Sequence, residues 1–184
     1  MLTDSIEIRL RPEQPGDSEF LYQLYASTRA EEMALTGWSD AQKEAFLRSQ
    51  FHLQYTHYHR YYPEASFDVI VEDAQPIGRL YVYRAPAEIR LMDIAIVPQY
   101  RSRGLGTRLL TRLLEEAADA GKPLTLHVDR NNPAARWYER LGFRPVAESG
   151  PYLQMERHAA SEPMAAEPMA AESHVADRGN AKSC

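Results

Sequence analysis

The sequence predicts a mixed α/β domain in which helices cover a mixed β-sheet, followed by a low-complexity tail. Strand-like and helix-like segments alternate along the first 158 residues. A hairpin region comes first and a β-α-β unit follows it, which is typical of a mixed sheet with helices packed on it. Hydrophobic residues make up 44% of the 184 residues and charged residues 26%, as in ordinary globular proteins. We therefore expect one α/β domain over residues 1–158.

Periodicity and capping residues predict the elements of the first half. Residues that alternate between apolar and polar indicate strands, and apolar residues three and four apart indicate helices. Ser39 or Asp40 is expected to cap the second helix, and Pro63 to end it. In chain order we expect a strand at 6–10, a helix after a turn at 15–17, a helix from 39 or 40 to about 61, and strands at 67–71 and 77–83 joined by a turn at 73–76.

The second half predicts a strand, a helix, a strand and a helix in alternation. Its first helix has an apolar stripe from Leu105 to Ala117 and a glycine, Gly121, just past its end. The expected elements are a strand at 89–97, that helix, a strand at 124–128, a helix at 132–141 and one or two strands within 143–155.

Composition excludes several classes of protein. The net charge of −5 gives no overall electrostatic attraction to nucleic acid. The single cysteine, Cys184, permits neither an intramolecular disulfide nor a cysteine-based metal site. No run of about 18 apolar residues exists for a membrane span, and Met1 to Leu10 lacks the apolar stretch of a signal peptide. We expect a cytoplasmic protein that binds neither nucleic acid nor membrane.

The last 26 residues differ from the rest. The five residues 162–166 are repeated directly at 167–171, with a proline in each copy. Such a repeat sustains neither a helix nor a ladder, and the segment has no aromatic residue to build a core. We expect 159–184 to be a disordered low-complexity tail, which is either an inert extension or a docking segment.

A glycine- and arginine-containing loop carries the chemical signal. The strand around Ile94 ends at Pro98, and a helix begins within a few residues of Arg101. A helix N-terminus combines unpaired backbone N–H groups with the positive end of the helix dipole, which makes an anion site. Gly104 and Gly106 have no Cβ, so a phosphate can approach the backbone closely. A pyrophosphate is the natural ligand.

Two motifs in this order resemble the GNAT superfamily of acetyl-CoA-dependent N-acetyltransferases. Arg101-x-x-Gly104-x-Gly106 is similar to the family's Gln/Arg-x-x-Gly-x-Gly/Ala motif, and the stretch 132–143 is similar to its second signature. The resemblance covers roughly residues 5–157. It implies a mostly antiparallel mixed sheet flanked by helices with a splayed central strand pair. It also implies acetyl-CoA as the acetyl donor and a small-molecule or peptide amine as the acceptor.

The resemblance also implies residue roles. The strand Ile94, Ala95, Ile96 would splay from 124–128, and the freed backbone groups of Ile94 and Ile96 would bond the pantetheine arm. Asn132, or Asn131 because the spacing varies by one, would contact the cofactor, although Asn132 could equally be a helix cap. Tyr138 would protonate the departing thiolate, unless it is a core aromatic residue. The pyrophosphate would be held by the N–H groups of Arg101, Ser102, Arg103, Gly104, Leu105, Gly106 and Thr107.

The general base has to be chosen among carboxylates. Asp93 interrupts an apolar strand beside the expected cofactor, a costly place for a charge, and is the first candidate. Glu88 at the start of that strand is the second. Glu31 and Glu32 lie between the first two helices, where the family usually builds its acceptor site. Each of these carboxylates could simply be solvated or paired.

The segment 51–62 is dense in histidine and aromatic residues. Its histidines could ligate a metal, but no acidic or cysteine partner lies at ligand spacing, so no metal is expected. A helix that lines the acceptor pocket, or that simply packs on the sheet, fits better. The aromatic wall of such a pocket would consist of Trp38, Tyr55, Tyr58 and Tyr62.

Two rival functions stay open. A dinucleotide-binding oxidoreductase would explain a strand, Gly104-x-Gly106, a helix, a strand and then Asp129. Against it, Leu109 occupies the third glycine position and 98–102 makes the turn too long. The other rival is a non-catalytic acyl-CoA-binding domain of the same fold. The oligomeric state is expected to be a monomer or a homodimer.

Overall fold

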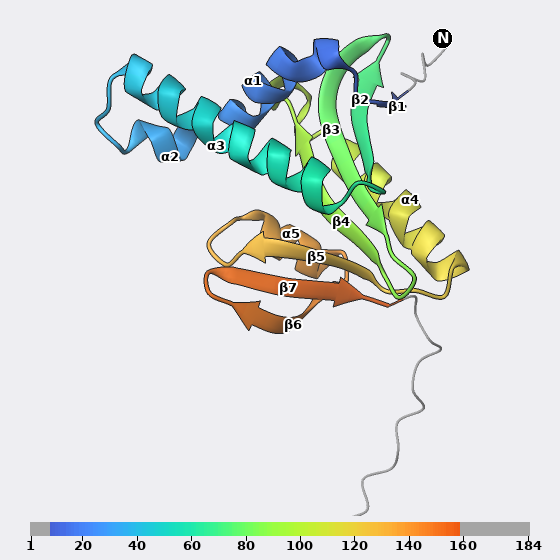
Figure 1. Cartoon of the computed structure of the whole chain (residues 1–184). Helices are drawn as coiled ribbons and strands as arrows, with labels where there is room; N and C mark the ends of the chain where they lie inside the picture. The colour runs from blue at the N-terminus through green and yellow to red at the C-terminus, as the bar shows by residue number, and fades with distance from the viewer. Residues whose placement is uncertain (1–7, 159–184) are drawn as a thin grey trace, which may run out of the picture.

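A computed structural model describes residues 8–158 of the chain (Figure 1). Residues 6 and 7 of the first expected strand and the whole tail at 159–184 lie outside the described residues. Within residues 8–158, no helix is both long enough and apolar enough to cross a membrane.

Seven strands within residues 8–158 form one sheet in the order β1-β2-β3-β4-β5-β7-β6. Among the described strands, only β4 and β5 run parallel, and every other neighbouring pair is antiparallel. The mixed, mostly antiparallel sheet is therefore as the sequence predicts. The strands are β1 (Ile8–Pro12), β2 (Ser66–Glu72), β3 (Gln75–Arg84), β4 (Ile89–Ile96), β5 (Leu124–Asp129), β6 (Arg144–Ser149) and β7 (Tyr152–Arg157).

Helices cover both faces of the sheet (Figure 1). One buried cluster joins α1, α2 and α3 to Val69 and Val71, and a second joins α4 and α5 to the other face. Ile70, between the two valines, belongs to the second cluster, as expected for a strand buried on both faces. The α-helices are α1 (Ser18–Thr28), α2 (Ala30–Ala34), α3 (Asp40–Tyr61), α4 (Leu105–Asp119) and α5 (Ala134–Arg140), with 3₁₀ turns at Pro15–Asp17 and Pro98–Tyr100.

The capping signals placed α3 correctly. The Ser39 side chain accepts a hydrogen bond from the Gln42 N–H, and the helix ends at Tyr61, two residues before Pro63. The sequence reading missed α2, so Glu31 and Glu32 lie in a short helix instead of a connection. The first strand also runs two residues further than predicted, to Pro12.

A β-bulge in β4 changes which residues face which layer. Tyr81 of β3 pairs with Asp93, whereas its neighbour Val82 pairs with Leu91, so Met92 is the extra residue. Leu91 and Ile94 therefore both pack toward α4 and α5, although they are three positions apart. The bulge turns Asp93 out of that apolar core and toward α3.

Candidate functional site

The two central strands separate after three residue pairs. Pairing between β4 and β5 joins Ile89–Leu91 to Leu124–Leu126, and no pair follows it among the described residues. The outer edges of both strands stay paired, β4 with β3 and β5 with β7. An opening therefore lies between 92–96 and 127–129. The described structure thus contains the splayed strand pair.

The direction of the β4 backbone can be read from its pairing with β3. The Val97 N–H donates to the Ile77 carbonyl at 2.9 Å, so Val97 points at β3. Because backbone groups alternate along a strand, Ala95 also points at β3, whereas Ile94 and Ile96 point into the opening. These are the two residues expected to bond a pantetheine arm, whereas the backbone groups of Ala95 point at β3, where Ala95 pairs with Arg79.

A run of backbone N–H groups follows the open end of β4. Among the described residues, none of the N–H groups from Ser102 to Thr107 donates a hydrogen bond to a protein acceptor. Ser102 and Gly104 adopt positive φ values of 60° and 74°, and α4 begins at the next residue, Leu105. The N-terminus of this 15-residue helix thus presents successive donors at the positive end of its dipole, which suits a pyrophosphate.

The two arginines of the loop are held by protein groups. Arg101 donates from Nε to the Ile96 carbonyl at 2.8 Å and from a terminal nitrogen to Ser27 Oγ at 3.2 Å. Arg103 pairs with Glu72 at 3.1 Å, and its guanidinium lies 4.9 Å from the Tyr100 ring centroid. Backbone N–H groups are therefore the main donors that the loop offers to an anion.

Gly106 also permits close contact between α4 and α5. A Cβ at this position would lie 3.2 Å from the Trp137 ring, tighter than ordinary packing allows. Trp137 Nε1 in turn lies 3.4 Å from Thr107 Oγ1. A larger residue at this position would thus force the Trp137 ring to shift by a few tenths of an ångström.

The asparagines before α5 have local roles. Asn132 Oδ1 accepts a hydrogen bond from the Ala134 N–H at 2.9 Å, so the capping interaction is present. The Asn131 N–H donates to Asp129 Oδ1 at 2.8 Å, and both asparagines are exposed. Their side-chain amide nitrogens make no hydrogen bond within residues 8–158, which leaves them available to a ligand.

Tyr138 is buried with its hydroxyl unengaged. Its side chain is 7% exposed and packs on Trp137 and Phe143, with ring centroids 4.9 and 5.7 Å away. Burial and, second, the negative charge of Asp93 raise the pKa of Tyr138 above its usual value. No hydrogen bond to its hydroxyl is found in the described part of the chain. The phenol therefore keeps its proton at neutral pH.

Asp93 belongs to a buried charge network. Its Oδ2 accepts a hydrogen bond from Arg79 at 2.7 Å, and Arg79, with 4% of its side chain exposed, also donates to Gln54 Oε1 at 3.0 Å. The Tyr58 hydroxyl donates to the carbonyl of Met92, the bulge residue, at 3.3 Å. Burial first and the charge of Asp93 second raise the pKa of Tyr58. Asp93 is thus close enough to influence phenols on both faces of the sheet.

The other candidate carboxylates lie elsewhere. Glu88 is at the closed end of the strand pair, where Arg90 donates to its Oε1 and Thr125 donates to its Oε2 at 2.8 Å. Glu31 and Glu32 are exposed on α2, and Glu32 pairs with Arg29 at 3.1 Å. Of the four candidate carboxylates, only Asp93 contributes to the raised pKa of Tyr138.

The expected aromatic wall divides into separate parts. Tyr58 and Tyr62 face the sheet and contact Tyr81 and Tyr83. Tyr55 turns away from the opening, toward Glu13. The fourth member, Trp38, packs on Phe46 at the outer end of α3. Sequence reasoning missed Arg79, although an arginine amid the apolar residues of a central strand is a signal that could have identified it.

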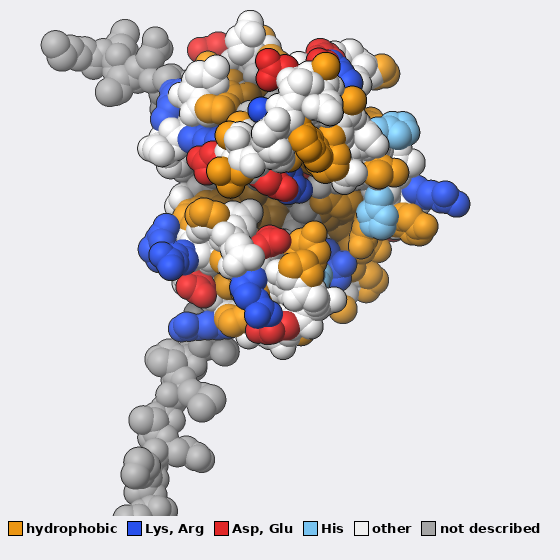
Figure 2. All heavy atoms as spheres, turned by 90° about the vertical axis from the view of Figure 1, so that its left-hand side faces the viewer, with side chains coloured by type: hydrophobic (Ala, Val, Ile, Leu, Met, Phe, Trp, Pro, Cys, Tyr) orange, Lys and Arg blue, Asp and Glu red, His pale blue; other side chains and the backbone are white. Residues whose placement is uncertain are grey.

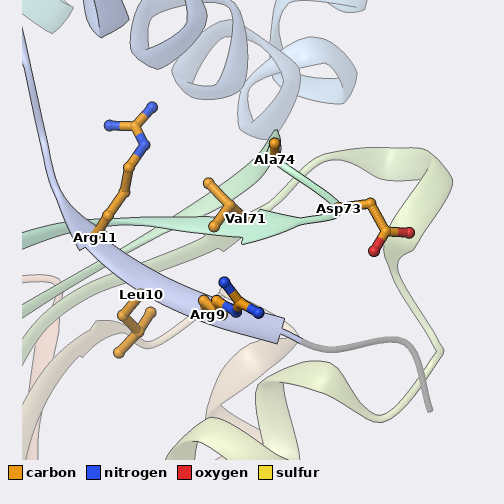
Figure 3. Close-up of a pocket in the computed structure, with 6 residues that line it drawn as sticks. All are labelled: Arg9, Leu10, Arg11, Val71, Asp73 and Ala74. Atoms are coloured by element: carbon orange, nitrogen blue, oxygen red, sulfur yellow. The ribbon is translucent and has the colours of Figure 1, made fainter.

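The surface is hollowed on the side where the opening lies. Figure 2 shows a recess with a hydrophobic floor and acidic side chains at its rim, between the half that carries α1 to α3 and the half that carries β5 to β7. A separate concavity lies at the edge of the sheet, lined by Arg9, Leu10 and Arg11 of β1 and by residues beside the β2–β3 turn (Figure 3). None of the predicted site residues lines that second concavity.

Comparisons with known proteins agree with this geometry. The model of the acetyltransferase (GNAT) family matches residues 21–143. The chain is similar to the ribosomal protein bS18-alanine N-acetyltransferase of Haemophilus influenzae, with 35% identity over 42% of this chain and 53% of the relative. It is also similar to the thialysine N-epsilon-acetyltransferase of Mus musculus, with 36% identity over 35% of this chain and 39% of the relative. The matched stretch thus spans about half or less of these curated relatives.

Solved structures match over most of the described chain. The PaiA N-acetyltransferase of Thermoplasma acidophilum in complex with coenzyme A superposes with a TM-score of 0.63 at 19% identity, over 83% of this chain and 99% of that one. An acetyltransferase of Thermus thermophilus gives a TM-score of 0.58 at 24% identity, over 83% and 97%. At these identities the likeness concerns the fold.

Proposed function

Because the chain belongs to the acetyltransferase (GNAT) family, we propose that it transfers the acetyl group of acetyl-CoA to a primary amine. One observation carries the proposal. The backbone edge of β4 at Ile94 and Ile96, where only the Ile96 carbonyl is engaged by Arg101 within the described residues, is followed after a short turn by the unengaged N–H groups of 102–107. An extended ligand with an amide-containing arm and a pyrophosphate fits such a path, whereas a dinucleotide has no amide arm to pair with β4.

Bound acetyl-CoA would supply a reactive acetyl thioester, and the chain's own residues would bind it, orient it and transfer the protons. The N–H groups of 102–107 hold the pyrophosphate, while Ile94 and Ile96 pair with the arm. Asn131 or Asn132 offers an amide nitrogen to the same ligand. Binding of this kind fixes the acyl carbon relative to the amine, which is a large part of catalysis.

Tyr138 is proposed as the general acid. Its side chain is buried, its hydroxyl is unengaged within the described residues, and its raised pKa keeps the phenol protonated at neutral pH. The departing thiolate receives this proton. Proton transfer of this type contributes about 10²–10⁴ in rate.

Asp93 is proposed as the group that attracts the amine and takes its proton, directly or through water. Arg79 occupies Oδ2, whereas Oδ1 makes no hydrogen bond within residues 8–158. Once Asp93 is neutralised, the pKa of Tyr138 falls, because part of its elevation comes from the charge of Asp93. Proton uptake by Asp93 thus makes Tyr138 a stronger acid. Glu88 remains the second candidate, disfavoured because Arg90 and Thr125 engage both of its oxygens.

The acceptor is proposed only as an amine. Three of the curated relatives are named for a ribosomal protein alanine, for mycothiol and for thialysine, so their names do not agree on one acceptor. The carboxylate of Asp93, on the part of β4 that borders the opening, favours a cationic amine over an anionic one.

Thiol release from acetyl-CoA across a panel of amines tests the proposal. We expect turnover with at least one cationic primary amine, and loss of coenzyme A binding in Gly104→Glu. Saturable coenzyme A binding without turnover of any amine would indicate a non-catalytic binding domain. Binding of NAD without binding of coenzyme A would indicate the oxidoreductase.

A further inference from the structure

Glu13, directly after β1, joins two layers of the fold. Its carboxylate, 10% exposed, accepts hydrogen bonds from the hydroxyls of Tyr55 in α3 and Tyr81 in β3, each at 2.8 Å. His59 Nε2 of α3 lies 2.7 Å from the oxygen that Tyr55 also contacts. The Glu13 N–H itself donates to the Phe67 carbonyl at 2.9 Å. Both oxygens of one buried carboxylate therefore tie α3 to the sheet.

The contacts around His59 fix the orientation of α3. The imidazole is stacked between the rings of Tyr55 and Phe67, with both centroid distances 4.0 Å. Its Nδ1 donates to the Tyr55 carbonyl at 2.9 Å, because a carbonyl only accepts. Burial first, and then the hydrogen bond to Glu13, raise the pKa of Tyr55 to about 12, so this donor keeps its proton. A helix held at two positions one turn apart cannot rotate about its axis without breaking these contacts.

Tyr58 lies on the same turn of α3 and reaches the catalytic strand. Its hydroxyl donates to the Met92 carbonyl, and its ring meets the Tyr81 ring edge-on with centroids 6.0 Å apart. Tyr81 pairs directly with Asp93 across β3 and β4. The carboxylate of Glu13 is thus connected to the bulge through two routes, one along α3 and one through Tyr81.

We propose that Glu13 is a positioning residue for acetyl transfer, because its clamp on Tyr55, His59 and Tyr81 holds Tyr58 against the Met92 carbonyl and so sets the bulge that presents Asp93. The kinetic consequence rests on the proposed function. The conformational consequence rests on the contacts alone, so the two can fail separately.

The conformational test uses protein labelled with ¹³C at the methionine methyl groups. In Glu13→Gln, one oxygen becomes an amide nitrogen that accepts no hydrogen bond, and we expect the Met92 resonance to shift or broaden. Tyr58→Phe should move the same resonance, while Met155, buried on the opposite face, stays in place. Glu64→Gln, an exposed carboxylate after α3, is the matched control. An unchanged Met92 resonance in folded Glu13→Gln would overturn the inference.

The kinetic test separates positioning from stability. We expect Glu13→Gln to lower kcat/KM for the amine about ten- to a hundredfold, as small misplacements do, with KM for acetyl-CoA unchanged. Adding Tyr58→Phe should cost nothing further, because both changes release the same bulge. Losses that multiply, or a lower Tm with normal amine kinetics, would contradict the route through Tyr58.

Two results, a Glu13→Gln chain that does not fold and a wild-type chain without activity, require further measurements. If Glu13→Gln does not fold, Tyr55→Phe and Tyr81→Phe remove one donor each, and the same shift of Met92 is expected. If the wild-type chain turns over no amine, the proposed function fails, and the methionine spectra alone decide the role of Glu13.

Discussion

Replacing Tyr138 by phenylalanine separates chemistry from packing. The ring is 7% exposed and contacts Phe143 and Trp137, and phenylalanine keeps both contacts. The lost hydroxyl has no hydrogen-bond partner within the described residues, so no polar group is left unsatisfied. The free energy of unfolding should therefore change by no more than about 1 kcal/mol.

The rate should change far more. Loss of a general acid costs about 10²–10⁴ in kcat, which is about 2.7–5.4 kcal/mol of transition-state stabilisation at about 1.36 kcal/mol per tenfold change. The affinity for coenzyme A should stay close to that of the wild-type chain, because phenylalanine keeps the ring and leaves the backbone N–H groups of 102–107 unchanged. This difference between rate and stability is the signature of an acid.

Thiol release at saturating amine gives kcat, calorimetry gives the affinity, and chemical denaturation gives the stability. Tyr61→Phe, with the same change at a tyrosine that is 62% exposed, is the control and should behave like the wild-type chain. Normal turnover of Tyr138→Phe would show that the residue serves packing. A loss of coenzyme A affinity as large as the loss of rate would assign it to binding.

Three further outcomes are expected. Gly104→Glu should abolish calorimetric coenzyme A binding, whereas Gly104→Ala should retain it, because both share the strain of a positive φ, about 1–2 kcal/mol, and only glutamate adds charge at the anion site. Asp93→Asn leaves the buried Arg79 without its counter-ion, and denaturation should show a loss of about 3–5 kcal/mol unless Arg79 is also replaced by methionine. Finally, burial raises the pKa values of Tyr58, Tyr81 and Tyr138. The stability that these protonated phenols contribute is complete below about pH 10, the pKa of a tyrosine in the unfolded chain, and is lost as the pH rises through their higher pKa values in the folded chain. Unfolding midpoints that stay constant well above about pH 10 would therefore contradict the burial of these phenols.

The features that could be predicted are those with local causes. Ser39 and Pro63 bound α3 because caps and breakers act within a turn of the residue that carries them. The loop before α4 could be located for the same reason, since Gly104, Gly106 and the start of α4 are contiguous in sequence, whereas its binding of an anion stays a prediction. The separation of β4 from β5 could be predicted only from the family resemblance, because no local sequence pattern indicates where pairing between these two strands stops.

The features that were missed depend on contacts between distant residues. Five residues at 30–34 show too little periodicity to predict α2. The bulge at Met92 is hidden in an apolar run, although the misplaced charge of Asp93 was its visible sign. The convergence of Glu13, Tyr55 and Tyr81 spans 68 residues, and no spacing rule connects them.

The short contact between β4 and β5 has a mechanical consequence. Within residues 8–158 only three residue pairs join β4 to β5, so the sheet is close to two halves, β1 to β4 and β5 to β7, while Trp137 of α5 packs near Gly106 of α4 in the helical layer. A ligand that hydrogen-bonds to the free edge of β4 and to the N-terminus of α4 would fill the gap as an added strand does, and would hold the two halves of the sheet in a fixed relative position. Amide hydrogen exchange at Ile94 and Ile96 should then slow on ligand binding, together with exchange at 127–129 in the other half of the sheet. Ligand binding would thus make both halves of the sheet more rigid.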